Sequence, residues 1–224
     1  MTTRIGAAAV AALAATLAAG GALAAGQKAT FSDGARGWLG PAGAGGATTI
    51  DASIGRPAPA LHTQFEDFGI EFTNAKPMWL ASLKKPGAAE LGLRADTYSI
   101  NFFGQEVTRT LVLEIRDHHN PPDGYPFVAV WVPVGTLDST VTGWREMRTR
   151  IADTQATDLP AGWGGYGAED PNTGAPILPP GRTFANVLAN ADEIAYTTLE
   201  PGWFFDMAVF DVAVDDIFVR PAQD

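Results

Sequence analysis

The alternation of hydrophobic and polar positions predicts a chain built mainly from short β-strands. The clearest case is the run from Phe210 to Val219, where apolar residues recur at every second position on both sides of Asp215-Asp216. Such alternation is typical of a strand with one buried face. Because the acidic pair shifts the inward positions by one residue, we expect a β-bulge there. We also expect this last strand to lie beside the first one and close a sheet.

Two segments in the centre of the chain, residues 98–102 and 111–115, repeat the same period of two. A third segment, residues 127–134, follows them. The third segment is apolar on both of its faces, which is typical of a strand that is buried on both sides or lies in a groove. One of these faces carries Phe127 and Trp131.

A single segment shows helical periodicity. Apolar residues recur with the spacing i, i+3, i+4, i+7 from Phe184, and Thr183 is a suitable N-cap, so we expect one short helix near residues 183–191. The preceding residues 156–182 are dense in Gly and Pro and predict a long loop, of a length that tends to be functional or disordered. Short strands, Gly/Pro turns and one short helix together indicate an all-β fold, an antiparallel β-sandwich.

The first 24 residues have the features of a signal peptide. Arg4 is their only charged residue, and Ala22-Leu23-Ala24 fits the small-x-small rule for cleavage. The alternative is a weak membrane anchor, which the short length and Gly20-Gly21 disfavour. Cleavage leaves 224 − 24 = 200 residues, 25–224, and we expect them to form one secreted or periplasmic domain without membrane insertion.

Cysteine content and charge limit the classes of partner. The chain has no cysteine and a formal charge of −10. An exported protein of this length can be stable from its hydrophobic core without disulfides. An acidic surface repels phosphate backbones and anionic membranes, so we expect no nucleic-acid partner. It is compatible with neutral ligands and with divalent cations.

Aromatic residues are the main candidates for ligand binding. Sugar recognition needs flat aromatic faces beside side chains that hydrogen-bond to hydroxyl groups. Within the chain, Trp131 shares a strand face with Phe127, and two further candidates lie in the Gly-rich segment. The candidate ligand-binding residues are Trp131, Trp144, Trp163 and Tyr166. The alternative is that the Trp residues belong to the core or cover a sheet, which we favour for Trp38, Trp79 and Trp203.

Acidic residues near the two chain ends are candidate metal ligands. Asp33 in the first turn and Asp215-Asp216 in the last strand could meet and supply oxygen ligands to a structural Ca²⁺. The open alternative is that these acids are solvated or cap turns. His118-His119, next to Asp117, could suggest a transition-metal site. Adjacent histidines usually point apart, so we interpret this segment as a solvated loop.

Short motifs spread along the chain resemble the laminin B module, laminin domain IV type A. The motifs are Phe31-x-Asp33 with Gly37-Trp38, Gly55-Arg-Pro57, Thr183-Phe-Ala-Asn-Val-Leu-Ala-Asn190 and Val214-Asp-Asp-Ile-x-Val219. The resemblance would cover residues 31–219. It implies a jelly-roll sandwich similar to galactose-binding-like carbohydrate modules, without catalytic activity. It also implies relatives that bind sugars and hold a structural calcium ion.

These observations predict a secreted, non-catalytic binding module for carbohydrate. The expected partner is a glycan. The main alternative is a protein-binding or matrix-forming module, whose partner would be an extracellular protein. The sequence contains no Gly-x-Ser-x-Gly, His-Glu-x-x-His or phosphate-loop motif. A glycan hydrolase or lyase remains a further alternative, since Glu66, Asp67 and Glu71 could supply paired carboxylates.

Overall fold

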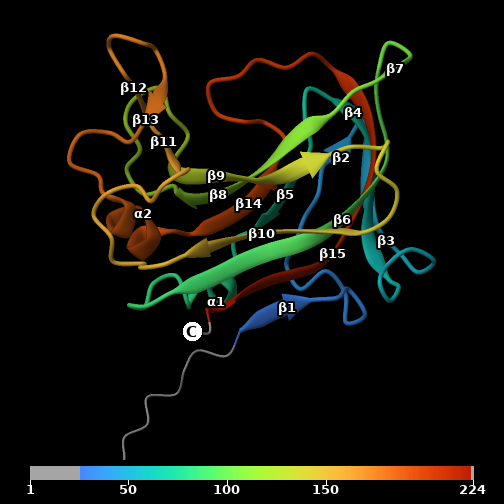
Figure 1. Cartoon of the computed structure of the whole chain (residues 1–224), viewed down its shortest axis with the longest axis horizontal. Coiled ribbons are helices and arrows are strands. Elements are labelled where there is room, and N and C mark those ends of the chain that lie inside the picture. Colours follow the sequence, from blue (N-terminus) through green and yellow to red (C-terminus); the bar gives the residue numbers. More distant parts are fainter. Residues whose placement is uncertain (1–25, 223–224) are drawn as a thin grey trace, which may run out of the picture.

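The computed structural model describes residues 26–222, which fold into two antiparallel β-sheets packed face to face (Figure 1). The strands of the larger sheet are β1 (Gln27–Ala29), β2 (Ala42–Gly43), β3 (Gly46–Asp51), β4 (Ala60–Asp67), β6 (Ala89–Phe102), β7 (Gln105–Glu106), β10 (Arg145–Ile151) and β15 (Ala208–Pro221). The strands of the smaller sheet are β5 (Glu71–Asn74), β8 (Arg109–Asp117), β9 (Val128–Leu137), β11 (Gly164–Tyr166) and β14 (Glu193–Thr197). The predicted all-β sandwich is confirmed.

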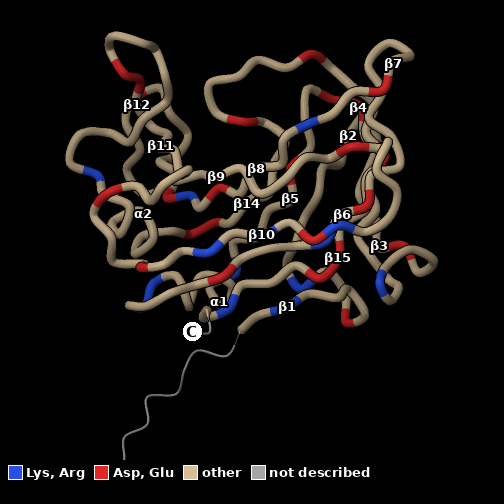
Figure 2. Tube along the Cα trace, in the orientation of Figure 1, with Lys and Arg blue, Asp and Glu red and all other residues tan. Residues whose placement is uncertain are grey.

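Strand order explains how the two sheets are joined. The larger sheet runs β10-β6-β15-β4-β3-β2, with β1 added beside β15 and β7 beside β6. The smaller sheet runs β11-β9-β8-β14-β5. Consecutive strands β4 and β5 therefore lie in different sheets, so the chain crosses from one layer to the other at residues 68–70. Charged residues lie along strands of both sheets and in the connecting loops (Figure 2).

The last strand has the central place that its sequence pattern predicts. β15 pairs with β6 and with β4, and its register against β6 shifts between Asp215 and Phe218, which confirms the predicted bulge. Asp216 adopts a left-handed conformation there, with φ of 52°. β1 pairs with the end of β15, with Ala29 opposite Ile217, so the two ends of the described chain lie side by side as predicted.

Two short helices accompany the sheets in the described part of the chain. α2 (Phe184–Asn190) confirms the helix predicted near residues 183–191, and the Thr183 hydroxyl accepts a hydrogen bond of 3.1 Å from the amide of Asn186. The prediction of a single helix was wrong, because α1 (Pro77–Leu80) is also present. One turn of helix is too short to show a hydrophobic period, although its proline stands at a favoured first position.

The Gly/Pro-rich segment contains more structure than a loop. Residues 156–182 include β11 and a two-stranded hairpin of β12 (Ala168–Glu169) and β13 (Pro176–Ile177). These strands have two or three residues each, too few to show alternation. Glycine is needed where the hairpin meets β11, because a Cβ at Gly165 would lie 2.4 Å from the amide nitrogen of Leu178.

The predicted signal peptide, residues 1–24, lies outside the described residues. No helix in the described part of the chain combines the length and the apolar character that a membrane span requires.

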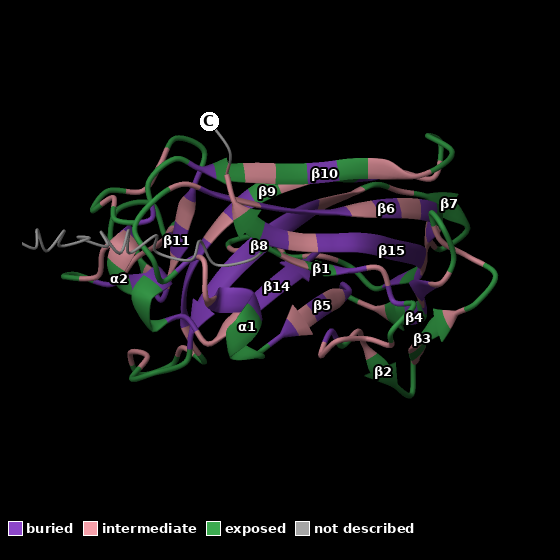
Figure 3. Cartoon of the chain, turned by 90° about the horizontal axis from the view of Figure 1, so that it is seen from below, coloured by how far each residue is buried: buried purple, intermediate pink, exposed green. Residues whose placement is uncertain are grey.

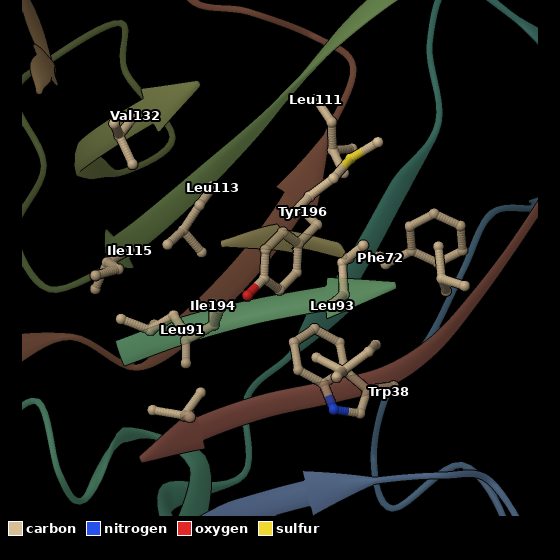
Figure 4. Packing of buried hydrophobic residues seen from close by; sticks show 14 of the residues in the cluster. Trp38, Phe72, Leu91, Leu93, Leu111, Leu113, Ile115, Val132, Ile194 and Tyr196 are labelled. Atoms are coloured by element: carbon tan, nitrogen blue, oxygen red, sulfur yellow. The ribbon is translucent and has the colours of Figure 1, made fainter. Parts of the chain in front are cut away.

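Inward residues of the two sheets form one hydrophobic core. Exposed positions along β10 alternate with intermediate or buried ones, as Figure 3 shows for this edge strand. In the interior, Leu91 and Leu93 of β6 face Leu113 of β8 and Tyr196 of β14 (Figure 4).

The tryptophans differ in burial. Trp38 and Trp79 are fully buried and in edge-to-face contact at 5.2 Å, as predicted for core residues. The same interpretation of Trp203 was wrong, since this side chain is 69% exposed in the loop before β15. The reason is that residues 198–207 leave the sheet after β14, so no facing layer covers Trp203.

Among residues 26–222, no group forms a hydrogen bond with the Tyr196 hydroxyl, which lies in this core. Burial alone raises the pKa of Tyr196, because no neighbouring group stabilises its charged form. An unsatisfied buried polar group costs about 1–3 kcal/mol. We therefore expect Tyr196→Phe to raise the free energy of unfolding by about 1 kcal/mol in urea titrations. Tyr98→Phe is the matched control, because Tyr98 is 44% exposed and should show no change. Destabilisation by Tyr196→Phe would contradict the prediction.

Candidate functional site

The outward face of the smaller sheet brings aromatic and charged residues together. On β9, Val128, Val130 and Val132 point into the core, so Trp131 points outward. Strand pairing places Glu114 of β8 opposite Trp131, and Arg116 opposite Ala129. The residues that this surface presents are Glu71, Glu114, Arg116, Trp131, Tyr166 and Glu193. We call this surface the five-strand face.

The indole of Trp131 lies flat against the backbone of β11. Gly164 is opposite Trp131 in the register, and a Cβ at Gly164 would lie 2.4 Å from Cε2 of the indole. The indole nitrogen donates a hydrogen bond of 3.2 Å to the carbonyl oxygen of Gly165. Glycine thus lets one side of the ring rest on the strand and fixes its orientation. The side chain remains partly exposed, so part of the indole surface can contact a ligand.

Three more rings continue the aromatic surface next to Trp131. Tyr166 follows two residues after Gly164, and its ring contacts Phe127 at 5.1 Å and Tyr125 at 5.4 Å between centroids. All three residues are partly exposed. Burial raises the pKa of Tyr166, and the nearby Glu114 charge raises it further. The Tyr166 hydroxyl therefore stays protonated and can donate a hydrogen bond at neutral pH.

Arg116 organises the charged part of the five-strand face. Its Nε donates to Glu114 at 2.6 Å, its Nη1 donates to Glu193 at 2.9 Å, and its Nη2 donates to Glu71. The guanidinium also lies 4.5 Å from the centroid of the Phe127 ring. Three strands, β5, β8 and β14, therefore hold one cation with three carboxylates around it, which fixes the position of each carboxylate.

The titration behaviour of this cluster follows from its burial. Burial raises the pKa of Glu114, which is 3% exposed, and Arg116 opposes this shift. Burial alone would lower the pKa of Arg116, but the hydrogen bonds and charges of Glu71, Glu114 and Glu193 raise it instead. The guanidinium is therefore charged at every working pH, while burial favours the protonated form of Glu114.

The structure separates the four predicted ligand-binding residues. Trp131 and Tyr166 lie on neighbouring strands of the five-strand face. Trp163 is only 9% exposed and packs edge to face on Phe184 at 5.1 Å, which favours the alternative that it belongs to the core, and its contact with a ligand stays a prediction. The sequence around Trp163 gave no sign of this burial, because the ring that packs on it, Phe184, comes from α2. Trp144 precedes β10 in the larger sheet and belongs to the opposite side of the sandwich.

The outer side of the larger sheet carries a shallow depression of about 250 Å³. Its charged lining residues are Lys28, Arg94, Glu146, Asp216 and Arg220, with Phe218 as the aromatic one. Asp216 accepts ion pairs from Lys28 at 2.8 Å and from Arg94 at 3.4 Å. Arg220 lies over Phe218 and binds Glu90 through two nitrogens. The charges here already pair with one another, which is typical of a solvated strand surface.

The three predicted calcium ligands do not form an oxygen cage. Asp215 accepts hydrogen bonds from the amides of Arg56 and Asp216, and both oxygens of Asp216 face cations. Asp33 is exposed in the turn after β1. Burial raises the pKa of Asp215, and the hydrogen bonds from the amides of Arg56 and Asp216 oppose this shift. Residues 26–222 contain no group of three or more side chains suited to a metal ion. Calcium binding stays a prediction.

We did not predict from the sequence that the site contains Arg116, Glu114 and Glu193. The alternation of Glu114 and Arg116 with Leu113 and Ile115 is a signal that both point outward from one strand. Their pairing with Glu71 and Glu193 had no local signal, because it depends on the register of β8, β14 and β5.

No protein-family model matches the chain, and no curated protein matches it. The resemblance to the laminin B module therefore stays a prediction.

Several solved structures have a similar fold. A xylan-binding domain described as CBM 22 has a TM-score of 0.46 and 9% identity, covering 88% of this chain and 95% of that chain. A family 11 carbohydrate-binding module from Clostridium thermocellum, in complex with a β-1,3-1,4-mixed-linked tetrasaccharide, has a TM-score of 0.47 and 12% identity, covering 89% and 97%. A carbohydrate esterase from the Shiga toxin-encoding bacteriophage phi24B has a TM-score of 0.46 and 13% identity, covering 90% and 99%. These likenesses assign neither a ligand nor an activity to this chain.

Proposed function

We propose that this protein is a secreted, non-catalytic carbohydrate-binding module whose five-strand face binds a glycan chain. The observation that carries the proposal is the Trp131 indole, held flat on Gly164 and bordered by Glu114 and Tyr166. An aromatic plane beside fixed polar groups is the arrangement that sugar rings require.

Binding would combine stacking with hydrogen bonds. The C–H surface of a sugar ring stacks on the open side of Trp131, and the rings of Tyr166 and Tyr125 extend the contact. Carboxylate oxygens of Glu71 and Glu193 accept hydrogen bonds from sugar hydroxyl groups. Because Arg116 already holds both carboxylates, little side-chain entropy is lost when a ligand binds.

No catalytic step is part of this proposal. Of the three acids considered as a catalytic pair, Glu71 is bound to Arg116 on the five-strand face. Glu66 and Asp67 lie on β4, a strand of the larger sheet. The arrangement thus supports binding rather than hydrolysis by these three acids.

Alanine substitution of the aromatic platform tests the proposal. We expect the mature protein, residues 25–224, to bind a glycan on an array of neutral and charged polysaccharides. Trp131→Ala or Tyr166→Ala should then weaken that binding by about tenfold or more in calorimetric titrations, because each removes a stacking partner. Trp203→Ala is the matched control and should bind as the unmodified protein does. Absence of binding to every glycan, or full binding by Trp131→Ala, would overturn the proposal.

A protein-binding module is the second candidate, and one observation favours it. Phe68 is 47% exposed, Trp203 69% and Phe204 86%, and the rings of Phe68 and Phe204 lie 6.3 Å apart. Exposed aromatic clusters of this kind often mark protein contacts. Under this alternative, Trp203→Ala would abolish binding to a protein partner while Trp131→Ala would not.

A further inference from the structure

The hydrogen-bonding polarity of the five-strand face restricts which glycans it can accept. Each of the three guanidinium nitrogens of Arg116 donates to a carboxylate: Glu114, Glu193 or Glu71. The Arg116 side chain is only 8% exposed. Arg116, which lies at the centre of the face, is therefore both covered and engaged, so it has little capacity to bind an acidic group of a ligand.

The carboxylates, in contrast, keep capacity to accept hydrogen bonds. The side chains of Glu71 and Glu193 are 32% and 21% exposed. Each uses one oxygen for Arg116, and a carboxylate can accept on both of its oxygens. Within residues 26–222, the second oxygen of each of these two carboxylates has no hydrogen-bond donor from the protein.

The charges of the cluster also do not cancel. One guanidinium and three carboxylates give a formal charge of 1 − 3 = −2 when all are ionised. This negative charge lies beside apolar rings, where screening by water is weaker than in bulk solvent. A hydroxyl group approaching Glu71 or Glu193 gains a hydrogen bond, whereas a carboxylate or sulfate group meets charges of its own sign.

We infer that Glu71 and Glu193 make the five-strand face selective for neutral glycans with free hydroxyl groups, and that they exclude glycans carrying carboxylate or sulfate groups. This inference rests on the proposed glycan-binding function. It assigns to the two partly exposed glutamates the role of specificity determinants, and to Arg116 the role of positioning them.

Paired polymers that differ only in charge test the selectivity. The probes are soluble β-glucan against the same β-glucan oxidised at C6, and methyl-esterified polygalacturonan against polygalacturonate. If a pair binds, we expect its neutral member to bind about tenfold or more tightly than its charged member at low salt. The preference should shrink in 0.5 M NaCl because salt screens repulsion between partly exposed charges.

Conservative variants separate charge from structure. Glu71→Gln and Glu193→Gln keep the size of each side chain, remove its charge and add an amide donor. Each should improve binding of the charged probe relative to the neutral one by about threefold or more, an effect that a loss of folding cannot produce. Glu146→Gln, on the larger sheet, should leave both affinities unchanged.

The outcomes distinguish the inference from the function on which it rests. Equal affinity for the neutral and charged members of each pair, with Trp131→Ala still impairing both, would overturn the selectivity and leave glycan binding intact. Absence of binding to all four probes and to every glycan on the array would overturn both proposals. An unchanged preference in both glutamine variants would overturn the assignment of Glu71 and Glu193.

Discussion

Replacing Arg116 with methionine is expected to destabilise the protein by about 3–5 kcal/mol, because it leaves a buried carboxylate without its cation. Glu114 is 3% exposed and has Arg116 as its ion-pair partner. Methionine retains much of the apolar contact with Phe127, so the loss reports mainly on charge. Urea unfolding of the two proteins at pH 7, analysed with a common slope, measures the difference.

The same variant should show a changed dependence on pH. Burial raises the pKa of Glu114 and Arg116 opposes the rise, so removing Arg116 moves the folded-state pKa further above the unfolded value. A raised folded-state pKa means that protonation favours the folded protein. The stability of Arg116→Met should therefore be best preserved below the unfolded pKa of glutamate, about 4.3, and fall as the pH rises through the folded-state pKa.

Two further variants make this result interpretable. Arg148→Met removes a cation whose side chain is 58% exposed and which pairs with Glu90 at 3.1 Å, so it should cost about 1 kcal/mol or less. Glu114→Gln combined with Arg116→Met should recover part of the lost stability, because no charge is then buried without a partner. Equal costs for Arg116→Met and Arg148→Met would contradict the interpretation of Arg116 as the organising cation.

Local patterns in the sequence were sufficient to predict the fold class. The bulge in β15 follows from an acidic pair that interrupts strict alternation, and the N-cap of α2 follows from one threonine before an apolar helical stripe. The short strands β12 and β13 could not be predicted in the same way. Two residues contain no period, and their pairing depends on contacts with β11 that form only in the folded chain.

The candidate site was predictable only in part, for a related reason. Trp131 could be placed outward because the valines on either side of it define the inward face. Trp163 gave no such reference, since a glycine-rich segment has no alternation against which burial can be judged. The carboxylates around Arg116 come from β5, β8 and β14, so their meeting is a property of strand register rather than of spacing along the chain.

Trp38→Ala is the second substitution with a large expected effect, a loss of about 3–5 kcal/mol in the free energy of unfolding. Trp38 is 1% exposed and packs against Trp79 at 5.2 Å and Tyr196 at 5.9 Å. Truncating it opens a cavity between residues of α1 and β14, which cannot both move to fill the space. The slope of the urea transition should stay unchanged, since the same surface is exposed on unfolding.

The position of Trp38 between the two sheets explains why replacing this one residue has so large an expected effect. The next residue, Leu39, exchanges two backbone hydrogen bonds of 2.9 Å with Thr73 of β5, the edge strand of the smaller sheet. β1 lies in the larger sheet, so residues between β1 and Leu39 connect the two layers, with Trp38 inserted between them. Trp203→Ala removes the same side chain from an exposed loop and should change stability by about 0.5 kcal/mol or less. If the two substitutions cost the same, Trp38 cannot be the side chain that holds the layers together at this edge.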